Sequence, residues 1–147
     1  MKKIVINRDY GLFNLSPKAI KKYLESHGKD CYFYDYDSKK GEFTRIDNEI
    51  AFKNPHKIKC IQTEYFGEYY DNNKYYKNVW KWLDAEFKAI RIARDDLNLI
   101  KVIEELGAEA NCKGVTLKII EIPDDVEWER KKDEYGEYII EKHRIWR

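Results

Sequence analysis

A short polar loop near the amino terminus carries the first residues that could bind a ligand. A β-branched run at residues 4–6 predicts a buried strand before the loop, and Ser16-Pro17 predicts a helix start after it. Such a junction offers free backbone amides and the positive end of a helix dipole, which suit a phosphate or carboxylate. We therefore predict that the loop binds an anionic group through Asn7, Arg8, Tyr10, Gly11 and Ser16.

The loop matches neither of the common phosphate-binding motifs. It lacks the P-loop pattern that ends in Gly-Lys-Ser/Thr, and it lacks the G-x-G-x-x-G dinucleotide fingerprint. The alternative is a structural strand–helix connection that Phe13 and Leu15 attach to the core. The sequence leaves both interpretations open.

Aromatic residues gather between residues 65 and 82, with lysines among them. Rings stack on bases and cations neutralise phosphate, so this pattern is typical of nucleotide or single-stranded nucleic-acid binding. Tyrosine and tryptophan also dominate protein interfaces, and a third interpretation places these rings in the core. In the nucleotide interpretation, the predicted ligand contacts are Tyr69, Tyr70, Tyr75, Tyr76 and Arg91.

Signals for catalysis and for metals are weak. Glu141 and His143 could form an acid/base pair with Asp9 or Asp35, which is the basis for a small hydrolase as an alternative function. No nucleophile stands in a recognisable motif. The cysteines and histidines lack metal-ligand spacing, and Cys31 and Cys60 stand in apolar runs typical of buried thiols. We expect no catalytic residues, no metal and no cofactor.

The charge balance limits the class of partner. The 147 residues carry 28 basic and 27 acidic side chains, and this net charge of +1 argues against broad nucleic-acid binding. Acids outnumber bases over residues 121–137, so an acidic protein-interaction surface is another alternative. No apolar run reaches the roughly 20 residues of a membrane span, and the amino terminus does not resemble a signal peptide. We expect a cytoplasmic protein without membrane contact.

The elements that must position these residues are mostly strands. Strands are predicted at 4–6, 31–36, 42–46, 58–65, 87–92 and 116–122, and a hairpin is predicted around residues 133–136. Helices are predicted over 17–27 and from Asp95-Asp96 onward, where Leu99, Ile100, Ile103 and Leu106 form an apolar stripe. The fold class is therefore α+β: one domain over residues 1–147, with a mixed, largely antiparallel sheet and two helices packed on one face.

Two stretches of the chain carry a resemblance: Val5 to Ser16, and Arg94-Asp95-Asp96 through Glu104-Glu105-Leu106-Gly107 to the run from Leu117 to Trp128. They resemble a family of small uncharacterised proteins encoded by bacteriophages and prophages. The family has a second glycine where this chain has Leu12, and a proline where it has Leu97. The resemblance implies a phage origin and an accessory role, for example against host defence. We thus expect a non-enzymatic accessory protein, for example in counter-defence, that binds a host protein or a small nucleotide-like ligand and forms a homo-oligomer.

Overall fold

The structure is a computed structural model that describes residues 1–37, 39, 42–63 and 86–142. The chain divides into two compact units. The first unit joins Met1–Leu15 to Ala89–Arg147, and the second is Ser16–Lys88. The first unit is therefore built from both ends of the chain.

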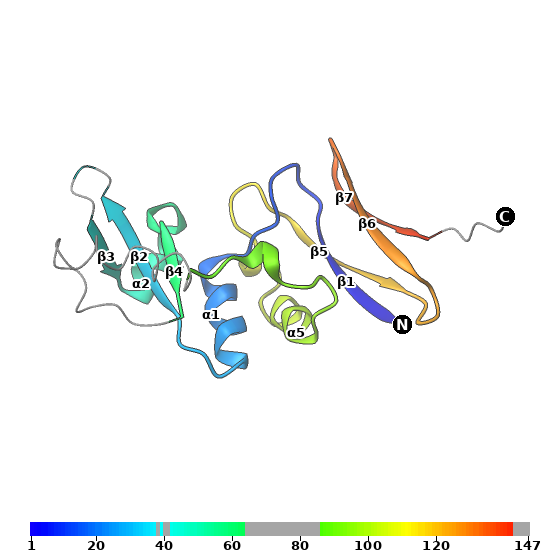
Figure 1. The fold of residues 1–147 in the computed structure, drawn as a ribbon, viewed down its shortest axis with the longest axis horizontal. Helices are drawn as coiled ribbons and strands as arrows, with labels where there is room; N and C mark the ends of the chain where they lie inside the picture. Colours follow the sequence, from blue (N-terminus) through cyan, green and yellow to red (C-terminus); the bar gives the residue numbers. More distant parts are fainter. Residues whose placement is uncertain (38, 40–41, 64–85, 143–147) are drawn as a thin grey trace. The chain divides into compact units, whose positions relative to one another are not determined.

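The first unit centres on a strand pair and a helix. Strand β1 (Lys2–Asn7) pairs antiparallel with β5 (Leu117–Ile122), with Ile4 opposite Ile120. Helix α5 (Leu97–Leu106) begins at Asp96, whose side chain accepts the N–H groups of residues 98 and 99. The helix lies beside β1 (Figure 1) and buries the apolar residues Leu99, Ile100, Val102 and Ile103.

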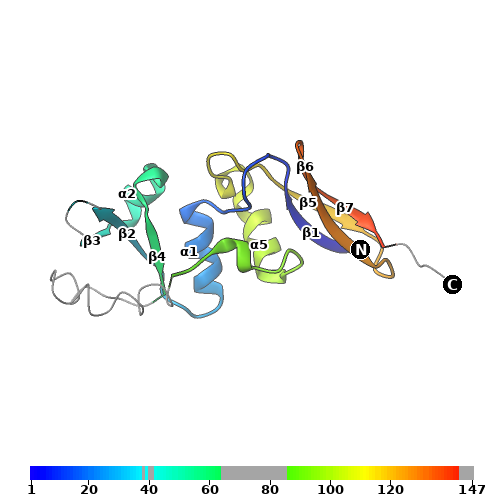
Figure 2. The ribbon, with the colours of Figure 1, turned by 45° about the horizontal axis from the view of Figure 1, so that its top comes forward.

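A hairpin completes the first unit. Strands β6 (Trp128–Asp133) and β7 (Gly136–Glu141) pair antiparallel and form a narrow ribbon (Figure 2). The Asp133 side chain accepts the Tyr135 N–H at 2.8 Å, and Gly136 takes a φ of +115° that other residues avoid. These two features fix the turn and bring the start of β7 beside β1.

The second unit begins with helix α1 (Pro17–Ser26), where the Ser16 hydroxyl accepts the Ala19 N–H at 3.2 Å. Its sheet has the order β3-β2-β4, with central strand β2 (Tyr32–Asp37) between β3 (Glu42–Ile46) and β4 (Cys60–Gln62). The short helix α2 (Asn48–Lys53) and a 3-10 turn (Pro55–Lys57) connect β3 to β4. Phe33 and Tyr34 on β2 are fully buried.

The α+β class is confirmed, and both predicted helices are present. The described strands form three separate antiparallel sheets instead of one mixed sheet, and α1 and α5 belong to different units. The strand predicted over 87–92 is wrong, because Ala89–Arg91 form a 3-10 turn. The alternation of apolar and polar residues predicted a strand, but the buried residues Ala89 and Ile92 are three positions apart, as in a helical turn, and Ile90 is half exposed. A single domain over 1–147 stays a prediction.

Candidate binding site

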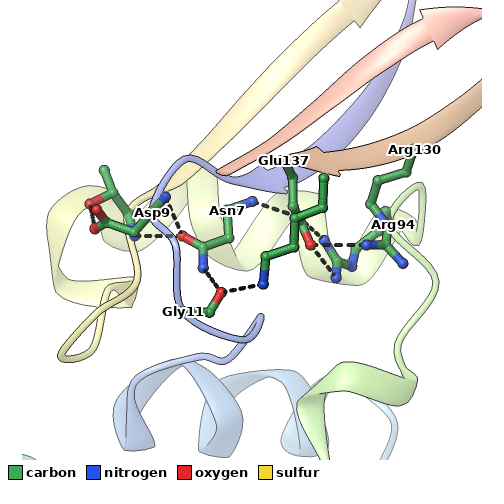
Figure 3. Close-up of polar contacts among 8 residues, drawn as sticks. Asn7, Asp9, Gly11, Arg94, Arg130 and Glu137 are labelled. Carbon is green, nitrogen blue, oxygen red and sulfur yellow. Dashed lines mark hydrogen bonds and ion pairs between the residues drawn. The ribbon is translucent and has the colours of Figure 1, made fainter. Parts of the chain in front are cut away.

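Asn7 is fully buried at the end of β1, and its side chain fixes the loop that follows. Its Oδ1 accepts the N–H groups of Asp9 at 3.0 Å and of Thr116 at 2.9 Å. Its Nδ2 donates to the Gly11 carbonyl at 2.9 Å (Figure 3). Three hydrogen bonds from one buried side chain hold a loop in a single conformation, since breaking any of them leaves a buried polar group without its partner.

Glu137 lies on the other side of Asn7 and is the centre of a buried ion cluster (Figure 3). Its Oε1 accepts the Asn7 N–H at 2.8 Å and a hydrogen bond from Arg94 Nη1. Its Oε2 accepts Arg94 Nη2 at 3.1 Å and Arg130 Nη1 at 3.0 Å. Burial alone would raise the pKa of Glu137, but the hydrogen bonds from Arg94 and Asn7 and the two positive charges outweigh it and lower the pKa. The carboxylate is therefore ionised at neutral pH.

Arg94 is held between Glu137 and an aromatic ring. Its guanidinium carbon lies 3.6 Å from the centroid of the Phe13 ring, a cation–π contact. Burial lowers the pKa of Arg94, and the hydrogen bonds and charge of Glu137 oppose that shift only in part; the guanidinium stays protonated at neutral pH. Arg94 pairs with Glu137 and lies against Phe13, so its guanidinium is not available to a ligand. The cluster instead holds the hairpin, β1 and the loop together.

Close contacts at two glycines bring three segments together. A side chain at Gly11 would place its Cβ 2.6 Å from the Gly114 carbonyl oxygen, and one at Gly136 would come within 2.5 Å of the Arg8 carbonyl oxygen. Lys132 also donates to the Gly11 carbonyl at 3.2 Å. The loop after β1, the turn before β5 and the β6–β7 turn therefore meet around Gly11.

Large apolar side chains remain in solvent where these segments meet. Tyr10 is 73% exposed, Leu12 is 72% exposed and Tyr135 is 80% exposed. Lys132 Nζ lies 5.7 Å from the centroid of the Tyr10 ring. We call Tyr10, Leu12 and Tyr135, with the exposed cations Arg8, Lys113 and Lys132 on the same segments, the loop–hairpin patch.

The structure places the predicted ligand residues in different environments. Arg8 and Tyr10 are exposed, whereas the side chain of Asn7 and the carbonyl of Gly11 are engaged within the loop. Ser16 belongs to the second unit and caps α1, and Arg91 is exposed at the end of the 3-10 turn. The predicted contacts Tyr69, Tyr70, Tyr75 and Tyr76 lie outside the described residues. Phe13 and Leu15 are buried, as the structural interpretation of the loop predicted.

Sequence reasoning missed Arg94 and Glu137. Glu137 counted as one acid of the 121–137 surface, but it is buried and paired with two arginines. Its partner Arg94 is 43 residues away, so no local spacing connects the two. The Asp96 cap and the hairpin turn place both residues near β1, but neither signal says that their side chains meet.

The described residues offer little for catalysis. Burial raises the pKa of the Cys31 and Cys60 thiols to about 12, which leaves them protonated and unreactive. Within the described residues, no group of three His, Cys, Asp or Glu side chains could hold a metal ion. Asp9 accepts a hydrogen bond from the Thr116 hydroxyl at 2.6 Å, and His143 lies outside the described residues.

No protein-family model, curated protein or solved structure matches the chain. In the part of the chain that the structure describes, no helix has both the length and the apolar character needed to span a bilayer.

Proposed function

We propose that this chain is a non-enzymatic binding protein that recognises a partner protein through the loop–hairpin patch. The observation that carries the proposal is the exposure of Tyr10 and Leu12, 73% and 72%, on a loop whose backbone is fixed by the buried Asn7. Aromatic residues in fixed positions are the usual anchors of protein interfaces. Tyr10 and Leu12 lie two residues apart on this loop, and neighbouring apolar side chains left in water are typical of interaction sites.

The rigid loop favours binding for an energetic reason. Association normally loses free energy when it orders loops and side chains, about 0.5–1.5 kcal/mol for each immobilised side chain. Here the hydrogen bonds of Asn7 and Lys132 order the loop backbone before any partner arrives. More of the apolar contact energy of Tyr10 and Leu12 then remains as affinity.

The resemblance to bacteriophage and prophage proteins supports a host protein as the partner. In this proposal the chain acts in the host cytoplasm as an accessory protein, for example against a defence system. A second copy of the chain would be a homo-oligomeric partner for the same patch, and light scattering of the purified protein separates the two cases.

A paired capture experiment tests the proposal. Tagged wild-type chain and the Tyr10→Ala/Leu12→Ala variant are incubated with bacterial lysate, and the retained proteins are identified by mass spectrometry. The control is Leu97→Ala, which removes a side chain that is 82% exposed at the start of α5, outside the patch.

We expect a partner that wild type and Leu97→Ala retain and the double variant loses. Titration calorimetry with that purified partner should show an affinity loss of about 30-fold or more, the effect of a truncated interface anchor. A partner retained equally by all three proteins would contradict the proposal. Circular dichroism checks that the variants are folded.

A nucleotide is the second candidate ligand, favoured by one observation. The Tyr10 ring is exposed and Lys132 Nζ lies 5.7 Å from its centroid, so a base could stack on the ring near cations. A thermal-shift screen with cyclic and linear nucleotides tests this candidate. A ligand at a hundredfold excess over its Kd adds about 2.7 kcal/mol of stability. If no nucleotide raises the unfolding midpoint, or if Tyr10→Ala shows the same rise as wild type, nucleotide binding at Tyr10 is excluded.

A further inference from the structure

We infer that two copies of this chain form a symmetric dimer in which strand β5 of one copy pairs antiparallel with β5 of the other. The inference concerns the open edge of the β1–β5 sheet and does not depend on the loop–hairpin patch. It follows from the backbone groups that this edge leaves unpaired.

The backbone of β5 alternates between groups that face β1 and groups that face the open edge. On β1, the Val5 N–H donates to the Arg94 carbonyl at 2.8 Å and therefore points away from β5. Val5 stands opposite Ile119, so these two residues form a non-hydrogen-bonded pair, whose backbone groups point outward on both strands. The N–H and C=O groups of Ile119, and those of Glu121 two residues later, therefore lie on the open edge.

The two edges of the sheet differ in how their outward groups are satisfied. On the β1 edge, the outward N–H groups in the second half of the strand donate to other parts of the first unit. On the β5 edge, the Leu117 N–H donates to the Asn111 side chain at 2.9 Å. Ile119 and Glu121 make no outward backbone hydrogen bond to any residue that the structure describes. A row of unpaired donors and acceptors on an extended strand is a template for another strand.

The unpaired groups of β5 are complementary to those of a second β5 in one register. If Ile119 stands opposite Glu121 of the second copy, the two residues exchange two hydrogen bonds, and the two-fold axis repeats them on the other side of Ile120. These bonds use every unpaired N–H and C=O group of the two residues on both strands. The half-buried Ile120 side chains then lie side by side as an aliphatic cross-strand pair. The two-stranded sheet becomes four-stranded, which is an ordinary size.

The residues at the ends of β5 fit the same register. Leu117 would stand opposite Pro123, which has no N–H, and its own N–H already donates to Asn111. The Pro123 carbonyl accepts the Val126 N–H at 3.2 Å, so the chain turns where the pairing would end. A shift by two residues in one direction would set Leu117 opposite Glu121 and compete with Asn111. A shift in the other direction would set two Glu121 carboxylates against each other.

A cysteine cross-link tests both the dimer and its register. Ile120→Cys places two thiols across the axis, where Cα atoms are about 4.5 Å apart and a disulfide fits. Lys118→Cys is the matched control, since its two copies would lie about 13 Å apart along the strands. Both variants also carry Cys112→Ser, which removes the native thiol that is not buried. We expect mild oxidation to cross-link Ile120→Cys at least about tenfold faster than Lys118→Cys on non-reducing gels.

A backbone variant tests the hydrogen bonds themselves. Glu121→Pro removes an outward N–H without removing a bond between β1 and β5, whereas the control Glu121→Ala keeps that N–H. Analytical ultracentrifugation should find wild type and Glu121→Ala as dimers with the same Kd. Glu121→Pro should raise the Kd of the dimer by about tenfold or more, because two of the four bonds are lost by symmetry. Circular dichroism checks that this variant is folded, and the cross-linking rates decide alone if it is not.

Three outcomes would overturn the inference. The first is a wild-type chain that stays monomeric up to the highest concentration measured. The second is equal cross-linking of Ile120→Cys and Lys118→Cys, which would indicate random collision. The third is a dimer that Glu121→Pro retains and Tyr10→Ala/Leu12→Ala loses, because such a dimer would form through the loop–hairpin patch.

Discussion

Glu137 joins three segments of the first unit, because its carboxylate receives four hydrogen bonds from them. In Glu137→Gln the amide nitrogen is a donor facing other donors, and two arginines lose their counter-charge. We expect a loss of about 3 kcal/mol in the free energy of unfolding, measured by urea denaturation. Glu129→Gln is the control: this carboxylate is half-exposed, lies 3.6 Å from Lys131, and should contribute under about 1 kcal/mol. Equal effects would show that the cluster is not stabilising.

The same carboxylate sets a pH dependence. Its pKa is lowered by folding from an ordinary value of 4.5, so the stabilisation is complete above 4.5 and is lost as pH falls through the lowered pKa. The difference in unfolding free energy between wild type and Glu137→Gln should therefore be constant near neutral pH and shrink in acid below 4.5. Urea titrations across that range measure the difference. If the difference in unfolding free energy stayed constant at the lowest pH measured, the effect of Glu137→Gln would come from packing and not from charge.

At the scale of elements, the hairpin is positioned by its closest contact with the loop after β1. Gly136→Ala would combine a φ of +115° with a Cβ 2.5 Å from the Arg8 carbonyl oxygen, so the hairpin must move. Gly107→Ala is the matched control, since its φ is +56° and its Cβ would meet open space. The control should lose about 1–3 kcal/mol of unfolding free energy from backbone strain alone, because its φ of +56° and ψ of −128° suit glycine only. We expect Gly136→Ala to lose clearly more unfolding free energy than the control, as measured by urea denaturation. Equal losses would mean that the hairpin can move away from the Arg8 carbonyl at little cost.

The elements could be predicted from the sequence where their signals are local. Ser16 and Asp96 cap the two predicted helices, and the turn around Asp133 closes the predicted hairpin, because each signal lies within a few residues of what it fixes. The candidate site could be predicted only in part. Arg8 and Tyr10 were recognised by type, but the meeting of the loop with Gly136 depends on chain segments more than a hundred residues apart. Such contacts follow from the assembled fold and leave no periodic pattern.

At the scale of the whole molecule, the first unit requires the two ends of the chain to meet. Lys2 stands opposite Ile122 in the β1–β5 pair, and the second unit, Ser16–Lys88, lies between these strands in the sequence. Closing so long a segment costs conformational entropy, but the cost grows only slowly with length. The Arg94–Glu137 pair and the bond from the Val5 N–H to the Arg94 carbonyl at 2.8 Å add contacts that offset this cost within the same unit.

Calorimetry can decide whether the two units unfold together. Buried apolar residues occur in both, for example Ile4 and Leu99 in the first and Phe33 and Tyr34 in the second. We therefore expect two thermal transitions, because units with their own apolar residues can lose structure separately. Glu137→Gln should lower the midpoint of one transition and leave the other in place, since the partners of Glu137 among the described residues lie in the first unit. A single transition whose midpoint falls in Glu137→Gln would instead support the single domain predicted from the sequence. In that case the loop–hairpin patch would unfold together with the rest of the chain.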